Sequence, residues 1–180
     1  MPKKPLFPAL AVCIVLILAG AACNLPTVPD GPGDAASTPT AAPESSEVRI
    51  YMVALDDNGA SGPLVVGCGD SLVEVRREIP PTTQPLRAAL EELLAQKDQY
   101  YGESGLYNAL YQSNLSVQSA AVMEESIATV ELTGQLVVGG TCDAPRVKAQ
   151  IVQTILGAGE FSWAEVFING QPIDEVLSQE

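Results

Sequence analysis

The sequence predicts an α+β domain, built as a single mixed β-sheet with two helices packed on one of its faces. Segments rich in branched and aromatic residues alternate with segments whose apolar residues recur at helical spacing. They follow one another in the order strand, strand, helix, strand, strand, helix, strand. Of the 180 residues, 47% are hydrophobic, which is enough to form the core of one domain.

The first half of the domain is expected to supply two strands and one helix. Val48–Leu55 and Leu72–Ile79 are short runs of branched and aromatic residues, which is typical of strands. A helix should follow, with Thr82 or Thr83 as its N-cap and Pro85 in its first turn, where proline is tolerated. Apolar residues at helical spacing predict its buried face, made of Leu86, Ala89, Leu90, Leu93 and Leu94.

The second half is expected to supply three strands and one helix. Leu115–Met123 and Ile127–Thr133 should form a strand pair that turns at residues 124–126. Apolar and polar residues alternate in the second of these strands, which predicts one buried and one solvated face. Asp143 is expected to cap a second helix, and Trp163–Ile168 is expected to be the closing strand.

The N-terminus has the pattern of a secretory signal peptide, predicted to span residues 1–22. Two lysines precede an apolar run from Leu10 to Ala19, and the small residues Gly20–Ala22 follow. This run is shorter than the roughly 20 residues of a membrane span. Cys23 comes next, and the segment resembles a bacterial lipobox, with Gly20 where leucine is usual. We therefore expect Cys23 to carry a lipid. Conventional cleavage after Ala22 and an uncleaved signal anchor are the alternatives.

Residues 23–46 are expected to be a flexible linker between the lipid anchor and the domain at residues 47–180. The stretch from Asn24 to Ser46 contains five prolines, two glycines and many small polar residues, without apolar periodicity. Such a segment cannot bury enough apolar surface to offset the entropy of ordering. The expected location is thus the extracytoplasmic side of the cell membrane, with the domain held away from the lipid surface.

Charge and composition exclude several classes of function. The chain has 22 acidic and nine basic residues, a formal net charge of −13 at pH 7. Nucleic-acid binding requires clustered lysine and arginine, so we expect no nucleic-acid partner. The chain has no histidine, which removes the commonest general base and the commonest zinc ligand. We expect no catalytic residue, no metal site and no cofactor.

Cys68 and Cys142 remain after the N-terminal cysteines are set aside. In an exported protein an even pair of cysteines is most simply a disulfide. The bond would close a loop of 75 residues, which would stabilise the domain by about 4 kcal/mol in the chain-entropy model. A redox dithiol is the alternative, although such pairs normally have the close Cys-x-x-Cys spacing. A metal site would need further thiol or imidazole ligands.

The order of short motifs along the domain resembles the sporulation and spore germination family, whose domain is called GerMN. The resemblance covers about Val48 to Val176. It depends on an opening strand, a helix, a glycine-rich loop, a strand pair and an Ile-Asn-Gly turn, here Val48–Leu55, Pro85–Leu94, Gly102–Tyr107, Leu115–Leu132 and Ile168–Gly170. The resemblance implies an envelope lipoprotein with a non-catalytic binding or assembly domain. It carries over no catalytic residues, and the cysteine pair is not a general feature of the family.

A tyrosine-rich loop is the candidate ligand site. Aromatic rings beside a carboxylate could stack on a sugar and bind its hydroxyl groups, and the residues concerned are Tyr100, Tyr101, Glu103, Tyr107 and Tyr111. The alternative is that these rings only cover the end of the first helix. Adjacent carboxylates also occur, but a glycosidase needs two carboxyl groups at a fixed separation across a cleft.

Two functions of different classes are therefore expected, and neither is enzymatic. The first is a protein-interaction module that uses a sheet edge or an uncovered sheet face to bind an unidentified envelope protein. The second is a module that binds peptidoglycan or another glycan through the tyrosine-rich loop. Exposure of the four tyrosine rings in a shared groove would favour the second function.

Overall fold

The computed structural model describes residues 45–65, 68–123 and 126–179. The predicted signal peptide and Cys23, most of the predicted linker, and the first two residues of the predicted turn at 124–126 lie outside these ranges. In chain order the elements are β1 (Ser46–Ala54), β2 (Leu64–Val65), β3 (Asp70–Ile79), α1 (Pro85–Ala95), β4 (Asn114–Met123), β5 (Ile127–Gln135), α2 (Asp143–Gly157), β6 (Trp163–Ile168), β7 (Gln171–Pro172) and α3 (Ile173–Leu177). The α+β class is as predicted.

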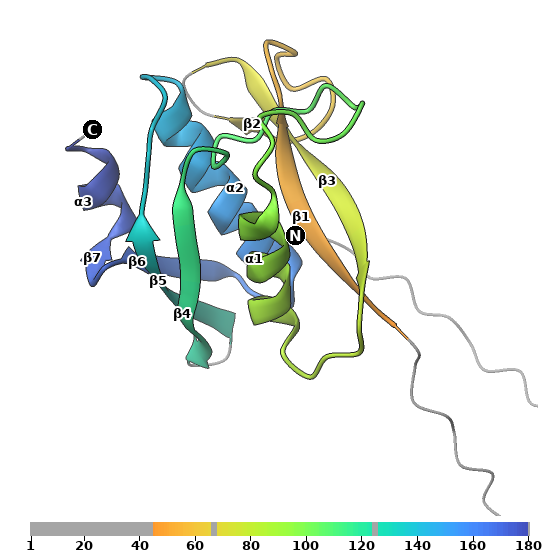
Figure 1. Ribbon diagram of the computed structural model, residues 1–180, viewed down its shortest axis with the longest axis vertical. Coiled ribbons are helices and arrows are strands. Elements are labelled where there is room, and N and C mark those ends of the chain that lie inside the picture. The colour runs from red at the N-terminus through yellow and green to blue at the C-terminus, as the bar shows by residue number, and fades with distance from the viewer. Residues whose placement is uncertain (1–44, 66–67, 124–125, 180) are drawn as a thin grey trace, which may run out of the picture. The chain divides into compact units, whose positions relative to one another are not determined.

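The strands form two sheets, so the prediction of a single sheet was wrong. One sheet has the order β1-β3-β2, and the other has the order β4-β5-β6-β7. Within the second sheet β5 and β6 run parallel, while the other neighbouring strands are antiparallel. The two sheets lie on opposite sides of α1 and α2 (Figure 1).

Polar side chains of α2 and the tyrosine-rich loop explain why the sheets stay separate. On the edge of β1, the backbone N–H of Tyr51 donates to Thr154 Oγ1 at 3.1 Å, and Gln150 Nε2 donates to the Tyr51 carbonyl at 2.9 Å. Two residues further along β1, Val53 exchanges two backbone hydrogen bonds with Tyr107 of the tyrosine-rich loop. These backbone groups therefore already have partners, and β1 cannot pair with a strand of the second sheet there.

Both helices pack between the sheets. Helix α1 contacts β1 and β4, and helix α2 contacts β1 and β6. The five residues predicted for the buried face of α1 are all buried. The main core lies entirely within the domain, and its largest fully buried apolar side chains are Ile50, Met52, Leu90, Leu93, Leu110, Leu132, Ile151, Ile155 and Ile168. A domain with its own core is expected to fold without the residues that precede it.

The helix starts differ from those predicted. The N-cap of α1 is Gln84, and Thr82 lies earlier, where its hydroxyl accepts from the Gln84 N–H at 3.0 Å. Asp143 is the first residue of α2, and its carboxylate binds other side chains. Neither helix has a side-chain cap, so both cap predictions were wrong.

The short elements β2, β7 and α3 were not predicted. No helix among the described residues is long and apolar enough to cross a membrane.

Candidate functional site

The structure divides the tyrosine-rich loop into buried and accessible residues. Tyr107 is only 7% exposed. Its hydroxyl donates to Asp143 Oδ2 at 2.9 Å, and its ring meets the rings of Tyr100 and Tyr111 edge-on, with centroids 6.0 and 6.1 Å apart. Burial, together with the adjacent Asp143 carboxylate, raises the pKa of Tyr107 well above its ordinary value. Tyr107 is therefore a structural residue and offers no ring face to a ligand.

Tyr100 and Tyr101 line a pocket of about 300 Å³ that also includes Arg77 and Asn108. Tyr100 is 47% exposed, whereas Tyr101 is half-buried and its hydroxyl accepts from Arg77 Nη1 at 3.0 Å. Buried Asn108 donates to the carbonyls of the neighbouring loop and accepts from the Leu110 N–H at 3.1 Å. Arg77, Tyr101 and Asn108 of the pocket thus already have polar partners, whereas the exposed Asp98 and Tyr100 also line it.

The remaining candidate residues of the loop lie apart from this pocket. Glu103 is exposed, Tyr111 is half-buried, and neither lines the pocket. Only two of the four tyrosines can therefore contribute to one binding surface. That surface is small, and it does not form the shared groove of ring faces that sugar stacking by the whole cluster would require.

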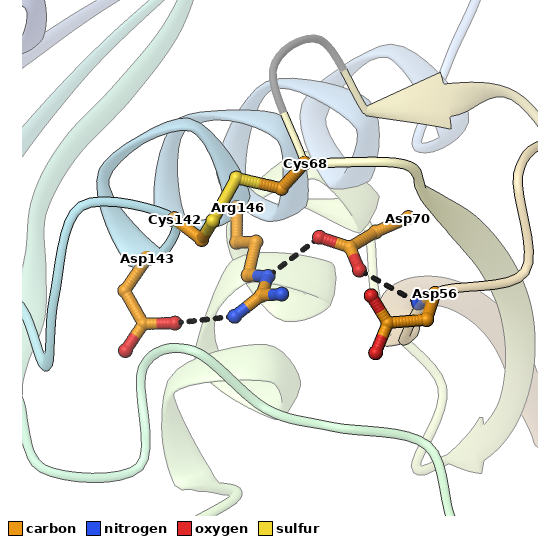
Figure 2. The surroundings of a disulfide bond; sticks show 6 residues. All are labelled: Asp56, Cys68, Asp70, Cys142, Asp143 and Arg146. Carbon is orange, nitrogen blue, oxygen red and sulfur yellow. Dashed lines mark hydrogen bonds and ion pairs between the residues drawn. A yellow bond between two sulfur atoms is a disulfide. The ribbon is translucent and has the colours of Figure 1, made fainter.

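A cluster of charged side chains lies beside the disulfide (Figure 2). Arg146, one turn into α2, donates to Asp70 Oδ2 at 2.7 Å and to Asp143 Oδ1 at 3.1 Å. Asp70 is fully buried, and its other oxygen accepts from the Asp56 N–H at 2.9 Å. The guanidinium also lies over the Tyr107 ring, 5.5 Å from its centroid. Arg146 therefore links β3, the start of α2 and the tyrosine-rich loop.

Opposing effects set the ionisation of this cluster. Burial by itself would raise the pKa of Asp70, but the hydrogen bonds from Arg146 and Asp56 and the positive charge of Arg146 lower it overall. The hydrogen bond to Asp70 in turn raises the pKa of Arg146. Asp70 is thus held as a carboxylate inside the protein. Its partners occupy both of its oxygens, which fits a structural ion pair better than an acid or base for catalysis.

The disulfide between Cys68 and Cys142 is present, with the two Cα atoms 5.8 Å apart. Sequence reasoning identified this pair but missed the adjacent charge cluster. The clue was that both cysteine segments carry an aspartate, at Asp70 and Asp143, which the disulfide brings to one place. Arg146 lies three residues after Asp143, a spacing at which two helical side chains are neighbours.

The adjacent carboxylates do not combine into a catalytic or metal site in the described part of the chain. Asp57 accepts from the backbone N–H groups of Gly59 and Ser61, which makes it part of a turn. Other members of such pairs form ion pairs, namely Glu91 with Arg87, Glu92 with Arg77, and Asp174 with Lys148. No group of three or more His, Cys, Asp or Glu residues that could hold a metal ion occurs in the described ranges.

The outward faces of the two sheets differ in character. On the first sheet, β1 and β3 carry Glu47, Arg49, Glu74, Arg76 and Glu78, several of them joined by ion pairs. Such a charged surface is well suited to contact with water. On the second sheet, Met123, Ile127 and Trp163 stand side by side across three neighbouring strands. Met123 is 55% and Trp163 is 63% exposed, so large apolar side chains face the solvent there.

An apolar groove continues from this face around the edge of β6. Its volume is about 590 Å³, and side chains of α2, β6, β7 and α3 line it, including Val152, Leu156, Trp163, Phe167 and Ile173. Glu165 also lines the groove and is exposed. An accessible apolar groove with exposed aromatic residues is typical of surfaces that bind other proteins. Sequence reasoning predicted a sheet edge or face but could not say which one.

An antiparallel sheet and a mixed sheet, with two helices between them and one disulfide, define a small α+β domain in the described part of the chain. The chain belongs to the sporulation and spore germination family, because that family's model matches residues 49–174. This result confirms the resemblance inferred from the sequence. No curated protein matches the sequence.

Two solved structures from Bacillus subtilis are similar in fold. The first contains the tandem GerMN domains of the sporulation protein GerM, with a TM-score of 0.51, 16% identity, and coverage of 71% of this chain and 40% of that one. The second is the first GerMN domain of GerM, with a TM-score of 0.50, 16% identity, and coverage of 71% of this chain and 85% of that one. At this identity the similarity establishes the fold alone.

Proposed function

We propose that this chain is a non-catalytic protein-interaction module, held by a lipid at the extracytoplasmic side of the cell membrane. The observation that carries the proposal is the apolar groove and face of the second sheet, where Trp163 is 63% exposed. Exposed apolar side chains have a free-energy cost unless another molecule covers them. The groove is open in the isolated domain, and its natural occupant would be part of an envelope protein.

The proposed anchor is Cys23, which would become the N-terminus after removal of residues 1–22. The lipobox-like segment and the short apolar run before it support this part of the proposal. Lipidation of Cys23 would keep the domain within reach of partners at the membrane, and the proline-rich linker would let it move there. The high concentration at the surface would allow even a weak interaction to be effective.

A glycan-binding module remains the second candidate, because Tyr100 and Tyr101 line an accessible pocket. The site favours this candidate less, since Tyr101 and Asn108 already have polar partners within the domain and Tyr107 is buried. An enzyme finds no support among the described residues, where most of the adjacent carboxylates are engaged in a turn or in ion pairs. Protein interaction would use the apolar groove, and glycan binding would use the pocket lined by Tyr100 and Tyr101. Mutations can therefore separate the two functions.

The test combines crosslinking in native membranes with sedimentation on purified peptidoglycan sacculi. The wild type is compared with Trp163→Ala, which alters the groove, and with Tyr101→Ala, which alters the pocket. Tyr107→Ala is not useful here, because this residue is buried and its loss would disturb the fold. Circular dichroism of each variant controls for folding.

A discrete protein adduct that Trp163→Ala loses and Tyr101→Ala keeps would support the proposed function. Sedimentation with sacculi that Tyr101→Ala loses and Trp163→Ala keeps would replace it with glycan binding. The lipid anchor is tested separately: Cys23→Ala should abolish a diacylglyceryl mass and the partition into detergent, and an unmodified wild type would refute this part.

A further inference from the structure

We propose that an extended, basic segment of the partner protein adds as a strand to the open edge of β6. This inference rests on the proposed function and names how the partner binds. In the second sheet β6 has β5 on one side over its whole length, from Trp163 to Ile168. On its other side β7 pairs only with Phe167 and Ile168. Within the described part of the chain, residues 163–166 therefore have no strand on that side.

Open strand edges recruit extended peptides, since their backbone N–H and C=O groups lack sheet partners. Proteins usually protect such edges, and contacts occupy parts of two other edges of this domain. On β4, Arg87 reaches the carbonyls of Val117 and Gln118 at 3.1 and 2.9 Å. On β1, α2 and the tyrosine-rich loop occupy the backbone groups of Tyr51 and Val53.

A second partly open edge makes the contrast with β6 clearer. Strand β2 pairs with Asp70 and Ser71, and the Leu72 N–H donates to the Pro63 carbonyl at 2.9 Å, so β3 is open on that side only beyond Leu72 in the described residues. This stretch carries alternating charges at Glu74, Arg76 and Glu78, and charged residues on an edge disfavour pairing with another chain. The open part of β6 contains one charge, Glu165, between Trp163 and Val166. It has the composition of a strand that pairs.

The groove gives room for the side chains that a paired strand would bring. It surrounds the edge of β6, with Val152 and Leu156 of α2 on one side and Ile173 of α3 on another. Alternate residues of an added strand point to opposite faces of the sheet. One set would enter the apolar groove, and the other would continue the outward face next to Trp163.

Charge determines which chemistry the added strand should have. Glu165 has no ion-pair partner among the described residues, whereas Lys148 at the groove wall is paired with Asp174 at 2.5 Å. A lysine or arginine opposite Glu165 on the added strand would form a cross-strand pair of opposite charge with it. A second copy of this chain fits poorly, because each copy has a net charge of −13 and would repel the other.

The experiment uses the domain at residues 45–180 and exploits the single tryptophan, Trp163, as a fluorescent probe of the groove. The ligand is a capped ten-residue peptide in which valine alternates with threonine and two lysines. An acidic peptide carries glutamate in place of lysine, and a third peptide has N-methylated backbone amides. Glu165→Lys reverses the charge at the edge, and Glu78→Lys makes the same change on the outward face of the first sheet.

The basic peptide should shift the Trp163 emission saturably and protect from hydrogen exchange those amides of residues 163–166 that face the open edge. Glu165→Lys should weaken the binding of the basic peptide about fivefold and strengthen that of the acidic peptide, whereas Glu78→Lys should change neither by more than about twofold. No saturable shift, or equal binding of the N-methylated peptide, would overturn strand addition. If native membranes still give a protein adduct that Trp163→Ala loses, the proposed function stands and only the binding mode fails.

Discussion

Replacing Arg146 with methionine tests the energetic role of the charge cluster. Arg146 is 15% exposed and is the only cation in contact with Asp70, which is fully buried, in the described residues. Methionine keeps much of the side-chain volume but leaves two carboxylates without a cation. Removal of one partner from a buried ion pair typically costs about 3–5 kcal/mol. We expect a loss of this size in the free energy of unfolding at pH 7, which is a large part of the stability of a small domain.

The loss should depend on pH in a defined direction. In the wild type the pKa of Asp70 is lowered, so its contribution to stability is present above the ordinary carboxyl pKa of about 3.9 and is lost as pH falls through the lowered value. Without Arg146, burial raises the pKa of Asp70, and protonation relieves the unpaired charge. The difference in stability between the wild type and Arg146→Met should therefore shrink as pH falls from 7 to about 4.

Urea unfolding, followed by far-ultraviolet circular dichroism at several pH values, measures both effects. The matched control is Arg76→Met, since Arg76 pairs with Glu74 on the exposed face of the first sheet and its side chain is 66% exposed. An exposed pair contributes at most about 1 kcal/mol. Equal losses for Arg146→Met and Arg76→Met, or a difference from wild type that grows towards pH 4, would refute the role assigned to the cluster.

Three further predictions concern the disulfide, a glycine and the anchor. Reduction of the Cys68–Cys142 bond should destabilise the domain by about 4 kcal/mol and lower Tm by on the order of 10 °C in calorimetry; an unchanged Tm would contradict this. Gly134→Ala should cost about 2 kcal/mol or more in urea unfolding, because Gly134 has a φ of +126° and a Cβ there would lie 2.1 Å from the Asn114 carbonyl oxygen. Gly140→Ala, where a Cβ meets nothing within 4 Å, is the control and should change stability by less than about 1 kcal/mol. Cys23→Ser should release the protein from membranes into the soluble fraction, and a variant that stays membrane-bound would point to an uncleaved signal anchor.

The longer elements could be predicted from the sequence because their patterns are local. The predicted strand Val48–Leu55 corresponds to Ser46–Ala54, and the apolar spacing of α1 identified its buried face correctly. Elements as short as β2 and β7, with two residues each, are too short for periodicity to be recognised.

The arrangement of the elements depends on contacts between distant residues, which local patterns do not contain. The two sheets are separate because Gln150 and Thr154 of α2 bind the backbone of β1 about 100 residues earlier in the chain. Gln150 and Thr154 are polar residues on the buried face of α2. This was the sequence signal that α2 binds polar groups of another element. The tyrosines are close in sequence, yet Tyr107 is buried while Tyr100 is exposed, because neighbours in a loop can point in opposite directions.

Site-specific photo-crosslinking in native membranes tests protein interaction through β6 most directly. A photoreactive amino acid is placed in turn at Trp163, at Tyr101 and at Glu78, which mark the groove, the tyrosine pocket and the charged sheet face. We expect a discrete protein adduct from position 163, whose intensity falls when Glu165→Lys is added, and no such adduct from position 78. Adducts with glycan from position 101, together with none from position 163, would contradict the proposed function.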